Sequence, residues 1–309
     1  MKETLKTSPF WPLIRDTYIG LRDLPQLPAA YLHPWRRASI EHLTQLKDIH
    51  KGQRAFIIGN GPSLKQTDLS KLQGEITFGM NRIYLMFEEL GFNTTYSSVV
   101  NDLVIEQTAQ DLAALEIPRF VTWRSRKYFE PKHMTPSQPP PNSQKREFGG
   151  GVETPPSSLP FSHGEKGKSR PNMGEGRSPT FLYTTYDSPR FSSDVRGRVW
   201  EGATVTYVTM QLAFHMGIKE VILVGVDHNY TTTGTPNTTI TSTGDDPNHF
   251  SGQYFGKGFR WQLPDLETSE MAYRMARKAY ENAGRRIVDA TVGGKLTIFE
   301  KMDYKRLFN

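Results

Sequence analysis

The sequence predicts a single α/β domain in which a mostly parallel sheet carries helices on both faces. From residue 54 onward, short apolar runs alternate with longer amphipathic segments, an order typical of parallel strands joined by crossover helices. Two of the apolar runs, 54–59 and 220–225, are uninterrupted and end in glycine, as expected of strands buried on both faces. Ligands of such sheets bind beyond the carboxyl ends of the strands, so a site is expected at that edge.

Hydrophobic periodicity places the individual elements. We predict strands at 54–59, 75–80, 95–100, 118–123, 180–184, 220–225 and 286–290. We predict helices at about 62–73, 83–91, 102–115, 203–217 and 266–284. Arg198 and Glu201 come just before the fourth of these helices and are expected to approach the site.

Residues 1–51 are predicted to form a helical or irregular extension that precedes the α/β domain of residues 52–309. Apolar residues recur at every third position from Ile40 to Ile49, so one amphipathic helix is expected at about 36–50, packed on the edge of the domain. Tryptophan and arginine residues earlier in the extension leave peripheral contact with a membrane open as an alternative role.

A segment of different composition interrupts the domain. Ten of the chain's 21 prolines fall within residues 131–179, together with three consecutive glycines. Because almost nothing in this segment can be buried, we predict a disordered insert at about 131–179. The segments on either side, 123–126 and 181–183, look like core or core-edge sequence, so the insert lies within the domain rather than between two domains.

The overall composition narrows the class of protein. No stretch approaches the roughly 18 apolar residues of a membrane span, and the first residues lack the apolar stretch of a signal peptide. The absence of cysteine excludes disulfides and thiolate metal sites. These features predict a cytoplasmic protein without a transmembrane segment. The net charge of +6 suits an anionic small molecule, and no arginine-rich helix or alternation of aromatic and basic residues indicates nucleic acid.

The turn after the first strand, Gly59-Asn60-Gly61-Pro62-Ser63, is the most informative local feature. Its glycines permit close approach of the backbone, and proline suits the first turn of a helix. The N–H groups of a helix N-terminus favour a phosphate, so we predict a nucleotide or a nucleotide-activated substrate here. An ordinary strand-to-helix turn is the alternative, since neither the Rossmann fingerprint nor the P-loop motif is present.

Two further strand ends carry polar side chains of the same kind. Asn81 and Arg82 follow the second predicted strand, and Asn101 and Asp102 follow the third. Asparagine both donates and accepts hydrogen bonds, which suits ribose hydroxyls, base edges and sugar hydroxyls. A lone asparagine at a strand end is usually a turn former, but with Asn60 there are three on one edge of the sheet. These residues are therefore predicted to bind the nucleotide.

The long polar segment at 228–264 is predicted to be a lid over this edge. Lys257 and Arg260 lie in it and are expected to bring positive charge to a leaving phosphate. Asp227, just before this segment, and Asp102 offer oxygen ligands for a metal. No compact carboxylate or His-x-x-x-His motif accompanies them, so no metal site is predicted.

His249 is the predicted general base, because histidine titrates near neutrality and can take a proton from an attacking hydroxyl. The alternative is a loop histidine that only caps Asp245 or Asp246. His228 comes shortly after the strand at 220–225 and is a second candidate.

Three motifs together resemble the MptE-like superfamily, also known as domain of unknown function 115, which is named for an archaeal 6-hydroxymethyl-7,8-dihydropterin diphosphokinase. The motifs are Ile57–Leu64, Gly79–Tyr84 and Gly225–Asp227. The same order of motifs is similar to the bacterial family 42 sialyltransferases, which use a variant of the Rossmann fold. The resemblance covers roughly residues 52–125 and 180–265 and implies a single Rossmann-like domain.

The resemblance also implies roles for individual residues. In the sialyltransferases the Gly-Asn-Gly-Pro-Ser turn and two further asparagines hold the cytidine nucleotide, which carries over to Asn60, Asn81 and Asn101. A histidine of the lid is the base in that family, and His249 is its counterpart. Tyrosines after the later Gly-x-Asp contact the donor phosphate there, and Tyr230 is nearest to that position.

The leading hypothesis is a transferase that moves a glycosyl group of sialyl or nonulosonate type from a CMP-sugar to a hydroxyl acceptor, without a cofactor. One alternative is the diphosphokinase reaction, with ATP and with Mg²⁺ on Asp102 and Asp227. The archaeal enzymes carry two carboxylates after the third strand where this chain has Asp102 alone, which favours the first hypothesis. A non-catalytic nucleotide-binding module is the other alternative. The oligomeric state is open.

Overall fold

The computed structural model describes residues 13, 14, 16–18, 21, 24–133, 178–232 and 234–308. The insert predicted at about 131–179 lies almost entirely outside the described residues; its first three residues form a short 3-10 helix, Pro131–His133. All seven predicted strands fall within the described part of the chain, and each of them forms.

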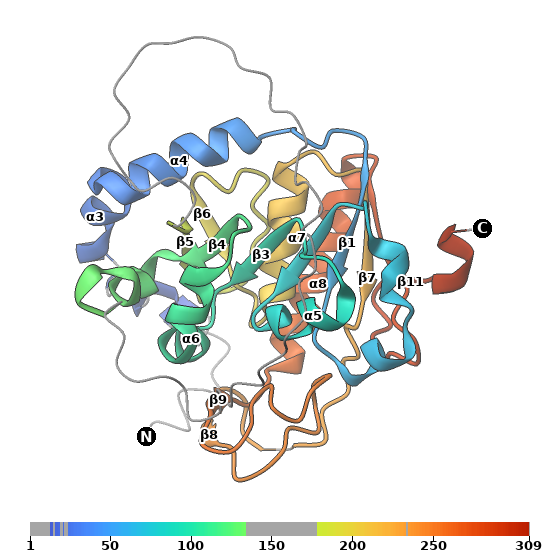
Figure 1. Ribbon diagram of the computed structural model, residues 1–309. Coiled ribbons are helices and arrows are strands. Elements are labelled where there is room, and N and C mark those ends of the chain that lie inside the picture. Colours follow the sequence, from blue (N-terminus) through green and yellow to red (C-terminus); the bar gives the residue numbers. More distant parts are fainter. Residues whose placement is uncertain are drawn as a thin grey trace, which may run out of the picture.

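A nine-stranded sheet forms the centre of the molecule, and all its strand pairs are parallel (Figure 1). The order across the sheet is β11-β10-β7-β1-β2-β3-β4-β5-β6. Its strands are β1 (Arg54–Ile58), β2 (Thr77–Met80), β3 (Tyr96–Val99), β4 (Arg119–Thr122), β5 (Thr180–Thr185), β6 (Arg198–Trp200), β7 (Glu220–Val224), β10 (Arg286–Asp289) and β11 (Glu300–Lys301). A separate antiparallel pair is formed by β8 (Thr239–Thr241) and β9 (Arg260–Gln262). The predicted α/β class with a mostly parallel sheet is confirmed.

Side chains of the central strands alternate between two buried clusters, one on each face of the sheet. In β1, Ala55 and Ile57 belong to one cluster, and Phe56 and Ile58 belong to the other. The same alternation runs through residues 221–224 of β7. Side chains of a strand point to opposite faces with a period of two, so a strand buried on both faces needs an uninterrupted apolar run.

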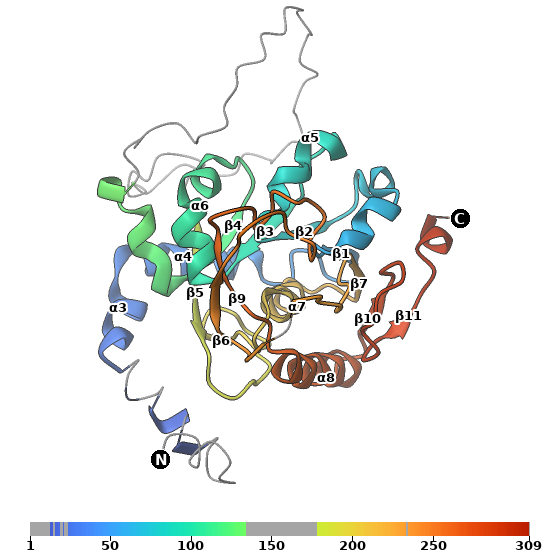
Figure 2. The same ribbon diagram turned by 90° about the horizontal axis from the view of Figure 1, so that it is seen from below.

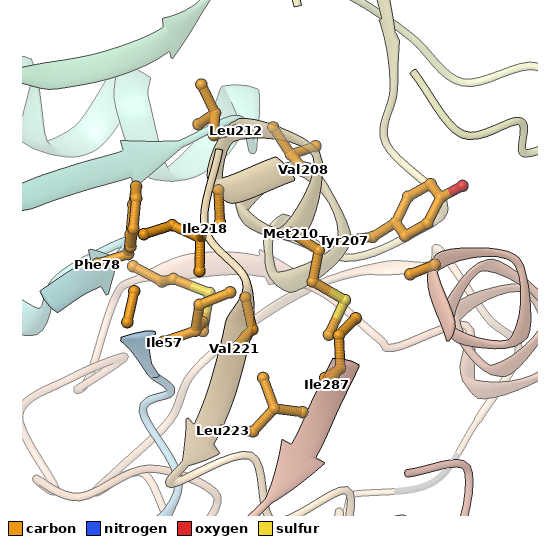
Figure 3. Packing of buried hydrophobic residues seen from close by; sticks show 14 of the residues in the cluster. Ile57, Phe78, Tyr207, Val208, Met210, Leu212, Ile218, Val221, Leu223 and Ile287 are labelled. Carbon is orange, nitrogen blue, oxygen red and sulfur yellow. The ribbon is translucent and has the colours of Figure 1, made fainter. Parts of the chain in front are cut away.

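Helices cover both faces, as predicted. From residue 24 onward, the α-helices of the described residues are α3 (Leu27–Leu32), α4 (Pro34–Leu46), α5 (Phe87–Leu90), α6 (Asp102–Ala114), α7 (Val205–His215) and α8 (Leu266–Asn282). Figure 2 shows α5 and α6 on one side of the sheet and α7 and α8 on the other. Figure 3 shows the second of these interfaces, where Val208, Met210 and Leu212 of α7 lie over Ile57 and Val221 of the sheet.

Helix α4 begins and ends a few residues earlier than predicted, and it joins the extension to the domain. Leu43 and Leu46 belong to the same buried cluster as α7. The Ser39 hydroxyl accepts the backbone N–H of Phe181 at 2.9 Å, so α4 contacts β5 through a hydrogen bond as well as through apolar packing. Ile49, the last residue of the predicted apolar series, is exposed.

The helix predicted at 62–73 is instead two short 3-10 helices, Pro62–Gln66 and Leu69–Leu72. Leu64, Leu69 and Leu72 are all buried in one cluster. Positions five residues apart are about 140° apart around an α-helix, so one helix could not direct Leu64 and Leu69 to the same core. The helix is interrupted between Leu64 and Leu69, and this interruption allows Leu64, Leu69 and Leu72 all to be buried.

The strand order places a topological switch point at β1. From β1 the chain moves outward through β2, β3, β4, β5 and β6, and it then returns through α7 to β7 on the other side of β1. The loops that leave β1 and β7 therefore diverge at the carboxyl edge of the sheet. Ligands of open α/β sheets bind in the crevice that such a divergence creates.

Candidate active site

A cavity of about 230 Å³ lies at this switch point. The loops after β1, β2, β3 and β7 line it, together with the residues that lead into α7. Residues 237–264, the larger part of the lid predicted at 228–264, close it from the other side and cross the carboxyl edge of the sheet (Figure 2). We call these residues the lid from here on. Ligand cavities usually measure about 300–1,000 Å³, so this one has room for part of a nucleotide sugar with the lid in this position.

The glycines of the first turn allow the loops after β1 and β7 to touch. A Cβ atom at Gly59 would overlap the carbonyl of Gly225, and one at Gly61 would overlap the carboxylate of Asp227. The N–H of Gly61 also donates to the Gly225 carbonyl at 2.9 Å. The Gly-x-Gly spacing is therefore required by contact between two loops of the protein itself.

Asp227 accepts hydrogen bonds from Ser63, in the turn that was predicted to bind a phosphate. Its carboxylate accepts the N–H of Ser63 at 3.1 Å and the Ser63 hydroxyl at 2.6 Å. Burial raises the pKa of Asp227, and the hydrogen bonds from Ser63 oppose that rise. The helix that begins at Pro62 is only five residues long, and neither Pro62 nor Ser63 lines the cavity. In this respect the turn differs from the predicted phosphate cradle.

Asn60, Asn81 and Asn101 all line the cavity, at the ends of three neighbouring strands. Asn101 is the N-cap of α6, and its side-chain oxygen accepts the N–H groups of Leu103 and Val104 at 2.9 and 3.3 Å. By contrast, the side-chain oxygens of Asn60 and Asn81 are buried and have no hydrogen-bond partner among the described residues. A buried carbonyl oxygen without a donor is costly, so these two amides are suited to a ligand that donates hydrogen bonds.

The cationic residues proposed for the nucleotide and the leaving group lie outside the cavity. Arg82 donates to the backbone carbonyls of Gln253 and Tyr254, and it thereby anchors the lid to the end of β2. Arg260 forms an ion pair with Glu106 of α6 at 3.0 Å. Lys257 is exposed and does not line the cavity.

His249 lies on the wall of the cavity, and only 12% of its side chain is exposed. Its Nδ1 lies 2.6 Å from Oδ2 of Asp246, which is 2% exposed. The ring stacks on Tyr254 with 4.1 Å between centroids and 12° between planes. Asp246 also accepts the N–H groups of Asn248 and Phe255 at 2.8 and 3.1 Å. The imidazole is thus held in one orientation by a buried carboxylate and an aromatic ring.

A second histidine with a carboxylate partner lines the same cavity. His228 has a left-handed backbone, with φ of 53°, and only 10% of its side chain is exposed. Its Nε2 lies 3.1 Å from Oε1 of Glu270 on α8, and Glu270 also pairs with Arg274 at 2.9 Å. Tyr230, two residues further along, lines the cavity as well.

A network of polar side chains borders the cavity. Only some of its members were predicted from the sequence. Glu201 lines the cavity and pairs with Arg124 at 2.8 Å, whereas Arg198, proposed beside it, does not line the cavity. Burial raises the pKa of Glu201, and the charge of Arg124 opposes that rise. Arg124 also binds Asp102 at 3.2 Å, which holds Asp102 in this network and away from the cavity lining.

Tyr186 was missed by the sequence analysis. It lines the cavity from the end of β5 and stacks under the guanidinium of Arg124, with 4.0 Å to the ring centroid. Its hydroxyl donates to Asp102 at 2.9 Å. No local signal distinguishes it, because it follows the strand by one residue and owes its place to Arg124, which is 62 positions away in the sequence.

The charge of the cavity is unlike that of the whole chain. Its described lining includes Glu201, Asp227 and Asp265, and no lysine or arginine. Within the described part of the chain, no three histidine, aspartate or glutamate side chains gather in a way that could hold a metal ion. None of the helices in that part is long and apolar enough to cross a bilayer.

No protein-family model matches this chain, and no curated protein matches it. Among solved structures, the chain is similar to the MAf glycosyltransferase from Magnetospirillum magneticum AMB-1, with a TM-score of 0.44 and 12% sequence identity. The similarity covers 97% of this chain and 43% of that protein, so the chain spans less than half of its length. A likeness at this level carries no functional argument.

Proposed function

We propose that this protein transfers a glycosyl group from a nucleotide-activated sugar, of the CMP type, to a hydroxyl acceptor. The observation that carries the proposal is the pair formed by His249 and Asp246 on the cavity wall, at 2.6 Å. A carboxylate can only accept a hydrogen bond, so in the neutral imidazole of His249 the proton is on Nδ1 and Nε2 keeps its lone pair. A histidine held in this tautomer is a general base.

The buried amides support the nucleotide part of the proposal. The side-chain oxygens of Asn60 and Asn81 need donors, and ribose hydroxyls or an exocyclic amine of a base supply them. The two residues end neighbouring strands, β1 and β2, so one ligand can meet both. The side-chain oxygen of Asn101 already caps α6, so Asn101 borders the cavity without offering that oxygen to the nucleotide.

Charge favours a donor with a single phosphate over ATP. A triphosphate carries several negative charges, and the described lining offers three carboxylates and no lysine or arginine to meet them. Asp102 and Asp227, which would bind Mg²⁺ in the diphosphokinase reaction, are engaged by Arg124 and Ser63. The one negative charge of a sugar–nucleotide phosphodiester costs much less to place here.

The proposed reaction balances without a cofactor. The acceptor oxygen forms a bond to the anomeric carbon while the bond from that carbon to the phosphate oxygen breaks. The electron pair of the broken bond stays on the departing nucleoside monophosphate. The proton of the acceptor hydroxyl moves to Nε2 of His249, and Asp246 stabilises the resulting imidazolium.

A nucleotide panel measured by thermal shift, with and without EDTA, tests the donor class. CMP is expected to raise the melting temperature by about 3 °C or more at saturating concentration, equally with and without EDTA. If only the combination of ATP and Mg²⁺ stabilises the protein, that result would instead support diphosphoryl transfer. If no nucleotide stabilises the protein, the proposal is wrong.

Turnover of the donor identified in that panel tests the base. His249→Gln is expected to lower kcat by about 10²- to 10⁴-fold while the CMP-induced thermal shift is retained. Asp246→Asn is expected to lower kcat as well, because its amide would offer Nδ1 a donor and reverse the tautomer. His50→Gln is the control: His50 lies outside the cavity lining, against Tyr96, and its loss should leave kcat within about twofold. Full turnover in His249→Gln would remove His249 as the base.

A further inference from the structure

The proposed reaction leaves a negative charge on the departing phosphate, and the cavity has few groups that can meet it. No lysine or arginine is present in its described lining. The two cations expected in this role do not line the cavity: Arg260 pairs with Glu106, and Lys257 is exposed. Arg82, which was predicted to bind the nucleotide, binds backbone carbonyls of the lid instead. Among the described residues of the lining, positive side-chain charge can therefore come only from the two histidines, His228 and His249.

His228 has a carboxylate partner that would stabilise a positive charge on its ring. Its Nε2 contacts the carboxylate of Glu270 at 3.1 Å, and the side chain is nine-tenths buried. The hydrogen bond from His228 lowers the pKa of Glu270, so Glu270 remains ionised beside the ring. Because Nε2 is engaged, Nδ1 is the nitrogen left for a ligand, and it makes no hydrogen bond within the described part of the chain. Nδ1 carries a proton only in the imidazolium form.

The backbone at His228 supports a role other than packing. Its φ of 53° is in the left-handed region, which is disfavoured for a residue with a side chain. The position lies in the loop after β7, next to Asp227, and lines the cavity. Strained positions of this kind are retained where the surrounding structure holds them, and they cluster at ligand sites.

We infer that His228, held by Glu270, is the group that binds the departing phosphate, while His249 acts as the base on the acceptor. This assignment rests on the proposed function and adds the leaving-group half of the site. The Nδ1–H of His228 donates to a phosphate oxygen, and no bond to His228 forms or breaks. Glu270 is a positioning residue, because it acts on the phosphate only through the imidazole ring.

Binding of a nucleoside and of its 5′-monophosphate separates this inference from the proposed function. The probes are cytidine and CMP, or the corresponding pair for whichever base the nucleotide panel selects, measured by calorimetry at pH 6. In the wild-type protein CMP should bind about tenfold more tightly than cytidine, which is the effect of one charge-assisted hydrogen bond. His228→Asn should abolish that advantage and leave the affinity for cytidine unchanged. Asparagine is chosen because it tolerates left-handed backbone.

Glu270→Gln and Glu281→Gln form a matched pair on α8. Each glutamate pairs with an arginine four residues away, but only Glu270 contacts His228. Glu270→Gln should reduce the advantage of CMP over cytidine about three- to tenfold, and Glu281→Gln should leave it unchanged. A role of Glu270 in stability alone would lower the melting temperature without changing this ratio.

The outcomes are distinct. If both probes bind and His228→Asn keeps the preference for CMP, the assignment of His228 is wrong and the proposed function stands. The same holds if Lys257→Ala removes the preference while His228→Asn does not. If the wild-type protein binds cytidine and CMP equally, the cavity has no phosphate site and the assignment fails. If neither probe nor any other such pair binds, the proposed function itself is overturned, and the role of His228 with it.

Discussion

The loops after β1 and β7 are in close contact, and this contact restricts which residues fit in the turn after β1. The backbone of Gly59 faces the Gly225 carbonyl, and Gly61 faces the carboxylate that binds Ser63. Gly225 itself has φ of 71°, and a Cβ there would overlap Leu64. These three glycines hold β1 and β7 together at the point where the cavity opens.

The variant Gly61→Ala tests this contact. The added methyl group would displace the carboxylate of Asp227 and break its hydrogen bonds to Ser63, so we expect a loss of about 2 kcal/mol or more in the free energy of unfolding. Urea denaturation measures it. Gly244→Ala is the control, because nothing lies within 4 Å of a Cβ there, and its effect should stay within about 0.5 kcal/mol. Equal effects of the two substitutions would show that the contact is unimportant.

At the scale of single elements, the lid is attached to the rest of the domain by a few long-range contacts. Arg82 binds the carbonyls of Gln253 and Tyr254, and its guanidinium lies 5.0 Å from the centroid of Phe259. The N–H of Phe250 donates to the carbonyl of Asn60 at 2.8 Å. These contacts place His249 on the wall of the cavity, so the lid positions the proposed base as well as covering the cavity.

Loss of Arg82 is expected to loosen the lid while the sheet stays intact. In Arg82→Gln, amide hydrogen exchange at Phe250 and Tyr254 should become about tenfold faster, because hydrogen bonds from a charged donor are lost. Exchange in α6 should not change. Arg260→Gln breaks only a half-exposed ion pair with Glu106 and should have little effect on either segment. Unchanged exchange in the lid of Arg82→Gln would contradict this account.

Helix α4 carries an arginine that is completely buried. Arg36 donates to the carbonyl of Arg196 at 2.6 Å, and its Nε and Nη1 have no partner among the described residues. Burial lowers the pKa of Arg36 from 12.5 to about 10. The folded protein thus holds this proton less tightly than the unfolded chain does, which disfavours folding at neutral pH. That penalty decreases only as the pH rises from about 10 toward 12.5.

Arg36→Met is accordingly expected to raise the free energy of unfolding at pH 7 by about 1–2 kcal/mol, because methionine fills the space without a charge. Urea denaturation at pH 7 measures the change. Arg306→Met, on a side chain that is 84% exposed, is the control and should be close to neutral. A loss of stability in Arg36→Met would mean that the hydrogen bond to Arg196 outweighs the cost of burying the charge.

At the scale of the whole molecule, the strand order brings distant parts of the sequence to one edge. Because β1 lies between β2 and β7, the loops at 59–61, 80–81 and 225–230 converge on one cavity. The chain has a net charge of +6, but the described lining of this cavity includes no lysine or arginine. The basic residues of the described part of the chain therefore lie outside the cavity lining, and the net charge gives no direct indication of the ligand.

Much of this arrangement could be predicted from the sequence, because it depends on local pattern. Uninterrupted apolar runs identify strands buried on both faces, and the residues just beyond them must lie on the carboxyl edge of a parallel sheet. Asn60, Asn81 and Asn101 line one cavity for this reason. The helix at 62–73 was predicted wrongly, since the burial of Leu64 and Leu69 in one core breaks it, and that core is formed by tertiary contacts.

The partners of each polar side chain were decided only by the tertiary structure. Ser63 meets Asp227 across 164 positions, Arg124 meets Tyr186 across 62, and His228 meets Glu270 across 42. No local periodicity specifies such pairs, because loops have no repeating pattern and take their conformation from what they contact. The sequence alone determined the sheet, the edge that carries the site and the residues available there. The packing of the lid and of α8 decided that His249 and His228 face the cavity while Lys257 and Arg260 lie outside it.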